Sequence, residues 1–198
     1  AKAVEDAELA IKVENAPPRR RADQAVPLGA MVNFLQNHYQ VGNRAMGDRL
    51  GQLVGEPALK LVTAMHLLNP APPLLFMGEE FGAATPFLYF SDWSGDLRQA
   101  VTEGRRKEFA LFPQFSNAET RALIPDPCDE GTFQRSKLDW STASQPEGQR
   151  WLSLYRELLG LRRLRIVPHL SMLLTGQHQA QRIGERALWV RWAFGSGI

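Results

Sequence analysis

The sequence has 198 residues, of which 44% are apolar and 22% are charged, and its formal net charge is +2. This composition predicts an ordinary globular chain of one or two domains. The longest apolar run, Pro70 to Met77, is too short to cross a bilayer, and the N-terminal residues have no apolar signal core, so we expect neither a membrane protein nor an exported one.

The cysteine and arginine content indicates the cellular compartment and the kinds of partner to expect. Cys128 is the single cysteine, so it can form neither an internal disulfide nor a paired-cysteine zinc site, and we predict a cytoplasmic protein without a cofactor. Arginine-rich runs such as Arg105–Lys107 and Arg162–Arg165 could suggest nucleic-acid binding. Because acidic residues are nearly as numerous and are interspersed, we expect solvated faces and local ion pairs, and no nucleic-acid or membrane partner.

The first 27 residues contain a short helical stretch, about residues 1–13, and then a connector rich in proline and arginine, to which we assign no chemistry. Residues Ala30–Gln36 form a compact apolar run that is typical of a buried strand. A polar loop, Asn37–Gln40, follows, and a helix then begins near Pro57. This helix has apolar residues at helical spacing, namely Leu59, Val62, Met65 and Leu68.

The same order of elements is repeated at once. Residues Pro73–Met77 predict a second short strand, which leads into Gly78–Glu80, a long loop and a helix that Asp96 can cap. Two consecutive strand–loop–helix units indicate a parallel sheet, in which functional groups gather where the strands end. We therefore expect the two strands to lie side by side and to present His38 and Glu79–Glu80 at a common rim.

The rest of the chain shows weaker periodicity until its end. Residues Ile124–Phe133 and Arg135–Trp140 are polar and rich in proline or charge, and we predict an ordered surface loop. A third helix, about Glu147–Leu164, has arginines on one face and apolar residues on the other, namely Trp151, Leu154, Tyr155, Leu158 and Leu161. Residues Gln179–Ile183 and Ala187–Phe194, joined by a turn at Gly184–Glu185, predict a hairpin that starts an antiparallel β-domain.

Several polar and aromatic residues are candidates for ligand binding. His38 lies between amide side chains and could hydrogen-bond a polyol, or it could simply satisfy loop carbonyls. Of the adjacent carboxylates Glu79 and Glu80, one could reach the rim while the other braces the following turn, although cap or salt-bridge roles are the more common use. Loop aromatics could stack on sugar faces, or they could pack the loop itself; these are Tyr39, Tyr89, Trp93 and the phenylalanines from Phe81 to Phe90.

Four stretches of the sequence carry a resemblance to a known family. They are Phe34–Leu50 (FLQNHYQVGNRAMGDRL), Pro72–Gly82 (PPLLFMGEEFG), Glu103–Phe109 (EGRRKEF) and, between Ile124 and Trp140, the segments IPDP, TF and SKLDW. In this order they resemble the bacterial malto-oligosyltrehalose trehalohydrolases, which are glycosidases of the alpha-amylase family. The likeness is strongest from about Leu28 to Pro168.

The resemblance implies a fold and a domain organisation. The fold is α/β, an incomplete (β/α)8 TIM barrel of which this chain supplies the last two βα units, followed by the start of a small C-terminal antiparallel β-domain. Residues 1–27 would be a connector from the preceding part of the barrel, residues 28–165 the C-terminal part of the catalytic barrel, and residues 166–198 the truncated start of the β-domain. The chain would thus be a C-terminal fragment.

The resemblance also implies an activity and divides the candidate residues by role. Enzymes of this family hydrolyse the α-1,4-glucosidic bond of maltooligosyltrehalose and release trehalose, for trehalose biosynthesis. Their two catalytic carboxylates follow the fourth and fifth strands, which this chain lacks, and Tyr39 occupies the position of the third catalytic aspartate. We therefore predict no catalytic residue and an inactive chain. The resemblance implies these substrate-binding residues: His38, Asn37, Gln40, Arg44, Glu79 and Glu80.

Two roles remain open for such a chain. As a glycosidase fragment, its expected partners are a maltooligosaccharide or maltooligosyltrehalose and the missing N-terminal part of the barrel. The alternative is a non-catalytic maltooligosaccharide-binding or regulatory module that tolerates the loss of the carboxylate. A repurposed Tyr39 nucleophile would need a nearby base, and the sequence identifies none.

Overall fold

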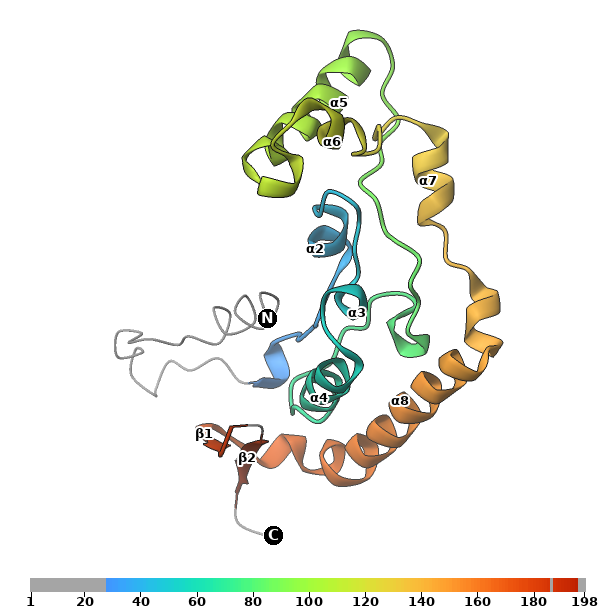
Figure 1. Cartoon of the computed structure of the whole chain (residues 1–198). Coiled ribbons are helices and arrows are strands. Elements are labelled where there is room, and N and C mark those ends of the chain that lie inside the picture. Colours follow the sequence, from blue (N-terminus) through green and yellow to red (C-terminus); the bar gives the residue numbers. More distant parts are fainter. Residues whose placement is uncertain (1–27, 186, 196–198) are drawn as a thin grey trace. The chain divides into compact units, whose positions relative to one another are not determined.

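The computed structural model describes residues 28–185 and 187–195, so the helix expected over residues 1–13 and the connector lie outside the described residues. Within this range the chain is mostly helical, with one small antiparallel sheet (Figure 1). The chain divides into two compact units. In the described residues, unit 1 comprises residues 28–33, Val62–Leu74 and 155–195, and unit 2 comprises Phe34–Leu61 and Leu75–Leu154. No helix in the described ranges is long and apolar enough to cross a membrane.

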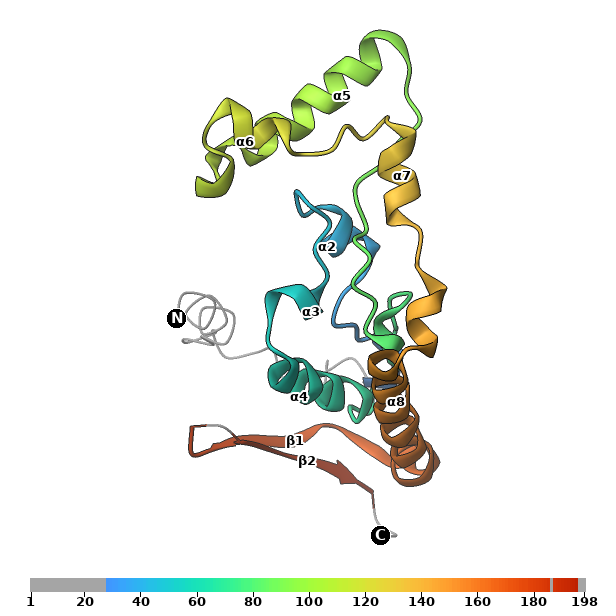
Figure 2. The same cartoon turned by 45° about the vertical axis from the view of Figure 1, so that its right-hand side comes forward.

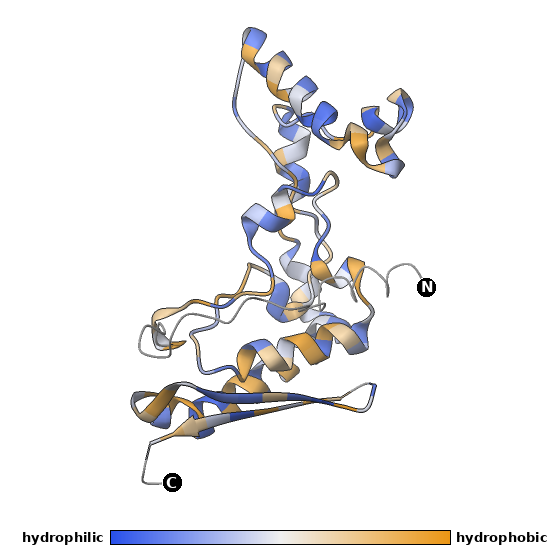
Figure 3. Cartoon of the chain, turned by 90° about the vertical axis from the view of Figure 1, so that its left-hand side faces the viewer, coloured by the Kyte–Doolittle hydropathy of each residue, from blue (hydrophilic) through white to orange (hydrophobic). Residues whose placement is uncertain are grey.

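The predicted C-terminal hairpin is confirmed in unit 1. Strands β1 (Leu173–Ile183) and β2 (Ala187–Phe194) pair in antiparallel register, with Gln181 opposite Trp189 (Figure 2). Strand β1 begins earlier than the sequence predicts, and an irregularity in the register separates Leu173 from His178. Most of β2 is apolar, whereas the second half of β1 is polar (Figure 3). A 3-10 helix, η7 (Val167–Met172), leads into this hairpin.

The two expected barrel strands are reduced to a single parallel bridge between Asn33 and Pro73. The Asn33 amide donates to the carbonyl of Pro72 at 2.9 Å, and the Leu74 amide donates to the carbonyl of Asn33 at 2.7 Å. The segments therefore run side by side in parallel at this point, as predicted. The prediction of regular strands over Ala30–Gln36 and Pro73–Met77 was wrong, because prolines 72 and 73 have no N–H to extend the ladder. A 3-10 helix, η2 (Leu28–Ala30), precedes the bridge.

A buried arginine holds the chain just before this bridge. Helix α4 (Glu56–Leu67) ends with backbone carbonyls that have no partner within the helix. The guanidinium of Arg162, on helix α8 (Pro146–Arg165), donates to the carbonyls of four residues there: Leu67, Asn69, Pro70 and Ala71. Burial lowers the pKa of Arg162. We expected the arginines of this helix to lie on its polar face, but Arg162 is only 7% exposed. The carbonyls replace the water that its guanidinium loses on burial.

The predicted apolar face of α8 is confirmed in part. Trp151, Tyr155 and Leu158 are buried, whereas Leu161, expected on the same face, is 42% exposed.

Replacing Arg162 by Met should lower the free energy of unfolding by roughly 2–4 kcal/mol, because four carbonyls would lose their buried donor. The matched control is Arg163→Met, since Arg163 is an exposed neighbour on the same helix and should change the stability by less than about 0.5 kcal/mol. Urea unfolding followed by circular dichroism measures both variants. Equal losses for the two would contradict the role of Arg162.

Unit 2 contains helix α5, the first part of α4 and several short helices. The predicted helix α5 (Gly95–Glu108) is confirmed, but Ser94 is its N-cap residue and Asp96, the predicted cap, lies in its first turn. The helix runs into the 3-10 helices η4 (Phe109–Leu111) and η5 (Pro113–Phe115). Helix α4 begins at Glu56, next to the Pro57 that marked its predicted start. The other elements of this unit are α2 (His38–Gly42), α3 (Leu50–Leu53), η3 (Glu79–Phe81), α6 (Ala118–Ala122), α7 (Glu130–Ser136) and η6 (Trp140–Ser144).

The prediction of a loop over Ile124–Trp140 was wrong, because this region contains α7 and leads into η6. Side-chain caps start these short helices. The Asp129 carboxylate accepts a hydrogen bond from the Gly131 amide, and the Asp139 carboxylate accepts one from the Ser141 amide. Helices of two turns or fewer are too short to show a hydrophobic period. Their capping residues are therefore the sequence signal that could have predicted them.

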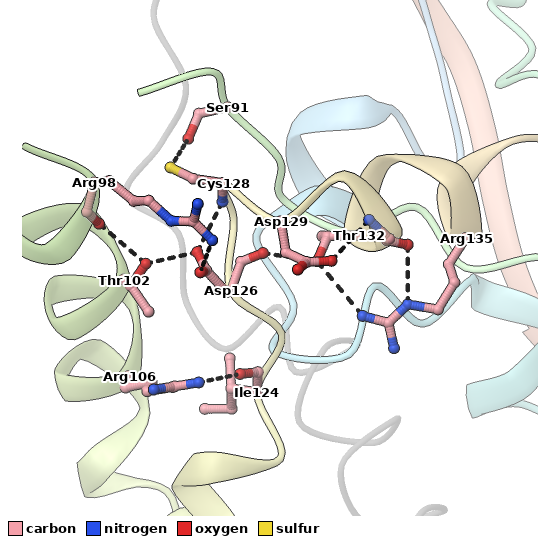
Figure 4. A network of polar contacts seen from close by, with 11 residues as sticks. Ser91, Arg98, Thr102, Arg106, Ile124, Asp126, Cys128, Asp129, Thr132 and Arg135 are labelled. Atoms are coloured by element: carbon pink, nitrogen blue, oxygen red, sulfur yellow. Dashed lines mark hydrogen bonds and ion pairs between the residues drawn. The ribbon is translucent and has the colours of Figure 1, made fainter. Parts of the chain in front are cut away.

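A polar network around Asp126 joins α5 to α7 (Figure 4). The Asp126 carboxylate accepts hydrogen bonds from the Arg98 guanidinium at 2.8 Å, the Thr102 hydroxyl at 2.7 Å and the Cys128 amide at 2.9 Å. Its backbone carbonyl accepts from the Thr132 hydroxyl at 2.7 Å. Burial by itself would raise the pKa of Asp126, but the three donors to the carboxylate outweigh it and lower the pKa to about 2.

This network should make the stability of the chain depend on pH. A carboxyl whose pKa is lowered by folding stabilises the native state above its unfolded pKa of about 3.9, and this contribution is lost as the pH falls through about 2. The free energy of unfolding should therefore be about 1 kcal/mol higher for wild type than for Asp126→Asn at pH 6, allowing for solvent screening. The difference should be smaller at pH 2.5. Urea unfolding at both pH values measures this, with exposed Asp92→Asn as the control. A difference that does not change with pH would contradict the account.

Candidate functional site

The first part of the predicted site lies on α2, where we had expected a loop. The Asn37 side chain caps this helix, since its Oδ1 accepts a hydrogen bond from the Gln40 amide at 2.8 Å. His38, Tyr39 and Gln40 form the first turn and are exposed, Tyr39 by 70%. The carboxamide oxygen of Asn37 is thus engaged in the helix cap, whereas the imidazole of His38 and the carboxamide of Gln40 are accessible to a ligand.

The second part is the turn that carries the two carboxylates. Helix η3 is flanked by Gly78 and Gly82, which have left-handed φ values of 85° and 64°. Glu79 is only 8% exposed, and its Oε2 accepts hydrogen bonds from the Phe76 amide at 3.3 Å and from Gln36 Nε2 at 3.4 Å. Glu80 is half-buried. The Glu79 carboxylate therefore braces the turn, and Glu80 is the more accessible of the pair.

Gln36 connects the elements of the site and was missed by the sequence analysis. Its amide nitrogen donates to Glu79, and its Oε1 accepts a hydrogen bond from the Leu50 amide at 3.0 Å, at the start of α3. The side chain is 5% exposed. One sequence signal could have identified Gln36: it is a polar residue at the end of the predicted buried strand Ala30–Gln36. A buried side-chain amide needs hydrogen-bond partners, so a linking role could have been expected.

Arg49 is the second residue that the sequence analysis missed. Its guanidinium is 2% exposed, lies 4.9 Å from the ring centre of Phe76, and donates to the carbonyls of Met77 (2.8 Å) and Thr85. These carbonyls stand at the two ends of the turn that carries Glu79 and Glu80. Burial lowers the pKa of Arg49, and the two carboxylates oppose this effect. Arg49 therefore fixes the turn and also compensates its negative charge.

Arg44, the remaining predicted residue, is held locally. Its Nη1 donates to the backbone carbonyl of Asp48 at 2.6 Å, and burial lowers its pKa while the charge of Asp48 opposes this. Its own carbonyl, with that of Gly42, accepts hydrogen bonds from the buried Arg105 at 3.0 and 2.8 Å. The Arg105 guanidinium in turn lies 5.0 Å from the ring centre of Tyr89. The end of α2 is thus fixed to α5.

The arrangement places exposed hydrogen-bonding side chains on two elements whose backbones are linked to each other. Gln36 links the segment before α2 to the turn of η3, so the exposed groups of both elements have a fixed backbone. Glycoside hydrolysis needs two carboxyl groups on either side of the scissile bond. Glu79 and Glu80 are adjacent in sequence, and the first is buried against backbone and amide donors. Among the described residues, no group of three or more His, Cys, Asp or Glu side chains could hold a metal ion.

Comparison with solved structures defines the class of protein. The chain matches part of a 1.4 Å crystal structure of a Salmonella typhimurium protein assigned as an alpha amylase, with a TM-score of 0.77 and 47% sequence identity. The match covers 86% of this chain and 28% of that one. The fold is therefore that of a part of an alpha-amylase structure.

Comparison with curated proteins gives the family. The malto-oligosyltrehalose trehalohydrolase of Deinococcus radiodurans is 43% identical over 181 residues, which are 90% of this chain and 29% of the relative. The one of Saccharolobus solfataricus is 41% identical over 133 residues, 67% of this chain and 21% of the relative. No family model matches. The chain is homologous to the malto-oligosyltrehalose trehalohydrolases, and it spans less than a third of the length of these relatives.

The two carboxylates should differ in their effect on stability. Glu79→Ala should lower the free energy of unfolding by roughly 1–3 kcal/mol, because it removes the acceptor of the Phe76 amide and of the buried Gln36 side chain. Glu80→Ala, in the same turn but half-buried, should cost less than about 0.5 kcal/mol. Thermal and urea unfolding compare the variants, and a larger loss for Glu80→Ala would contradict the assignment.

Proposed function

We propose that this chain provides a glucan-binding rim of a malto-oligosyltrehalose trehalohydrolase and cannot hydrolyse a glycosidic bond by itself. In this proposal the complete enzyme cleaves the α-1,4-glucosidic bond of maltooligosyltrehalose and releases trehalose, in the cytoplasm. The chain would contribute the last two βα units of a (β/α)8 barrel and the start of a β-domain.

The observation that carries the proposal is the pairing of an exposed His38–Gln40 turn with the braced Glu79–Glu80 turn, inside the stretches that resemble the family. Imidazole, carboxamide and carboxylate groups together both donate hydrogen bonds to sugar hydroxyls and accept them. Gln36 and Arg49 fix the backbone beneath these groups, so little ordering is needed when a ligand binds.

Two features support the view that the chain lacks catalytic machinery. Tyr39 stands where the family's aspartate is expected, and its side chain has no carboxylate to stabilise an oxocarbenium-like transition state. A tyrosine nucleophile needs a base, and among the described residues the Tyr39 hydroxyl has no hydrogen-bond partner.

The barrel part of the proposal rests on the parallel bridge between Asn33 and Pro73 and on exposed apolar side chains beside it. Met31 and Val32, in the segment expected to be a barrel strand, are 41% and 59% exposed. Strands of a closed barrel are covered on both faces, so further barrel strands and helices would bury these side chains.

The proposal predicts binding without turnover. Isothermal titration of the chain with maltooligosyltrehalose should give saturable binding, and a trehalose assay on the same sample should detect no release. His38→Ala should raise Kd about tenfold, the loss expected for one or two hydrogen bonds, whereas His178→Ala, on the exposed hairpin, should leave Kd unchanged.

Either of two results would overturn this proposal. Absence of saturable binding by a sample with native circular dichroism would contradict the binding role. Trehalose release at a rate proportional to the concentration of the pure chain would contradict the predicted lack of catalysis.

A further inference from the structure

An open groove of about 430 Å³ lies in unit 2 beside the carboxylate turn. We call it the aromatic groove, and the residues that define it are Met77, Phe87, Phe90, Phe133, Lys137 and Trp140. Its volume is within the range of about 300–1,000 Å³ that is usual for small-molecule sites. Sequence analysis considered Phe87 and Phe90 as part of an aromatic platform but missed the contribution of α7 and the residues after it.

The walls of the groove are ordered by ring contacts and hydrogen bonds. Phe90 packs edge-to-face on Phe87 and on Phe133, with ring centres 5.6 and 5.2 Å apart. Ser136 is 3% exposed; its hydroxyl accepts from the Leu88 amide at 3.0 Å and lies 2.9 Å from the Thr132 carbonyl, to which it donates. These contacts tie α7 to the extended segment around Leu88, so the groove does not depend on loosely held side chains.

The groove shares backbone with the turn that carries Glu79 and Glu80. Met77 lines the groove, and its carbonyl is held by Arg49 at 2.8 Å. The next residue, Gly78, packs against the wall of the groove, since an added Cβ would lie 2.7 Å from the side chain of Leu138, which also lines it. The groove therefore begins at the residue just before the turn that carries the two carboxylates.

The lining of the groove combines aromatic side chains with one cationic hydrogen-bond donor, Lys137. Trp140 is 66% exposed and Phe133 is 41% exposed, which leaves aromatic faces open to the C–H face of a sugar. The Lys137 ammonium lies 4.7 Å from the ring centre of Phe133, where it can donate to hydroxyl groups at the edge of a bound ring.

We infer that the aromatic groove is a sugar subsite, in which a glucosyl ring of the glucan stacks on Trp140 and donor groups of Lys137 hold its hydroxyls. This inference rests on the proposed function, and it specifies where the glucan lies once it has passed the rim formed by α2 and η3.

The test compares Kd for maltooligosyltrehalose by titration calorimetry in tryptophan variants. Trp140→Ala should raise Kd roughly fivefold, the loss of one stacking contact. Trp140→Phe keeps a ring and should stay within about twofold of wild type. The matched control is Trp189→Ala, because Trp189 lies on strand β2, is 42% exposed and does not line the groove, so this variant should leave Kd unchanged.

The outcomes separate this inference from the proposed function. If wild type binds and responds to His38→Ala, but Trp140→Ala binds as tightly as wild type, the subsite is wrong and the binding rim stands. If wild type does not bind at all, both fail. Trp140 also packs on Phe81, with ring centres 5.7 Å apart, so its removal could unfold the chain. If the Trp140→Ala sample is unfolded, Lys137→Met tests the subsite instead. That variant should weaken binding about threefold, and an unchanged Kd would overturn the subsite.

Discussion

Within each of the two units, buried guanidinium groups hold the backbone in place by donating hydrogen bonds to its carbonyls. Arg162 does this at the end of α4 in unit 1, while Arg49 and Arg105 do it in unit 2, at the carboxylate turn and at the end of α2. Each is at most 7% exposed. Where the described residues form few sheet ladders, such contacts satisfy carbonyls that would otherwise be buried without donors.

This construction explains why the candidate site is rigid although it stands on short elements. A five-residue helix such as α2 has little stability of its own, since helix nucleation is costly. It persists because Asn37 caps its start and Arg105 binds the carbonyls at its end. The same holds for η3, which Glu79 braces from within and Arg49 from outside. The groups proposed to bind glucan thus project from fixed backbone, and the aromatic groove continues from one of these fixed turns.

The sequence predicted the elements whose signals are local and long. Helices α4, α5 and α8 and the hairpin follow from periodicity, proline positions and turn residues. It did not predict α2, α6 or α7, because one or two turns show no hydrophobic period. The prediction of two barrel strands was wrong for a different reason. The segments did lie in parallel, but Pro72 and Pro73 limit the pairing to one bridge, and a ladder also depends on neighbours that no local pattern contains.

For the site, the sequence could suggest His38, Gln40 and the Glu79–Glu80 pair through position and resemblance. It could not say that Asn37 would cap a helix or that Glu79 rather than Glu80 would be buried, since adjacent carboxylates look alike in a sequence. It missed Gln36 and Arg49 because their partners are backbone groups between 14 and 36 residues away and another buried side chain, and such pairings arise only from the tertiary fold.

The central claim is that the first turn of α2 and the turn of η3 form one glucan-binding rim. The most direct measurement is a titration of the ¹⁵N-labelled chain with maltooligosyltrehalose, followed by amide correlation spectra. The account predicts that the amides of residues 38–40 and 78–80 shift together with a single Kd. Shifts confined to one of the two turns, or to neither at saturating ligand, would contradict it.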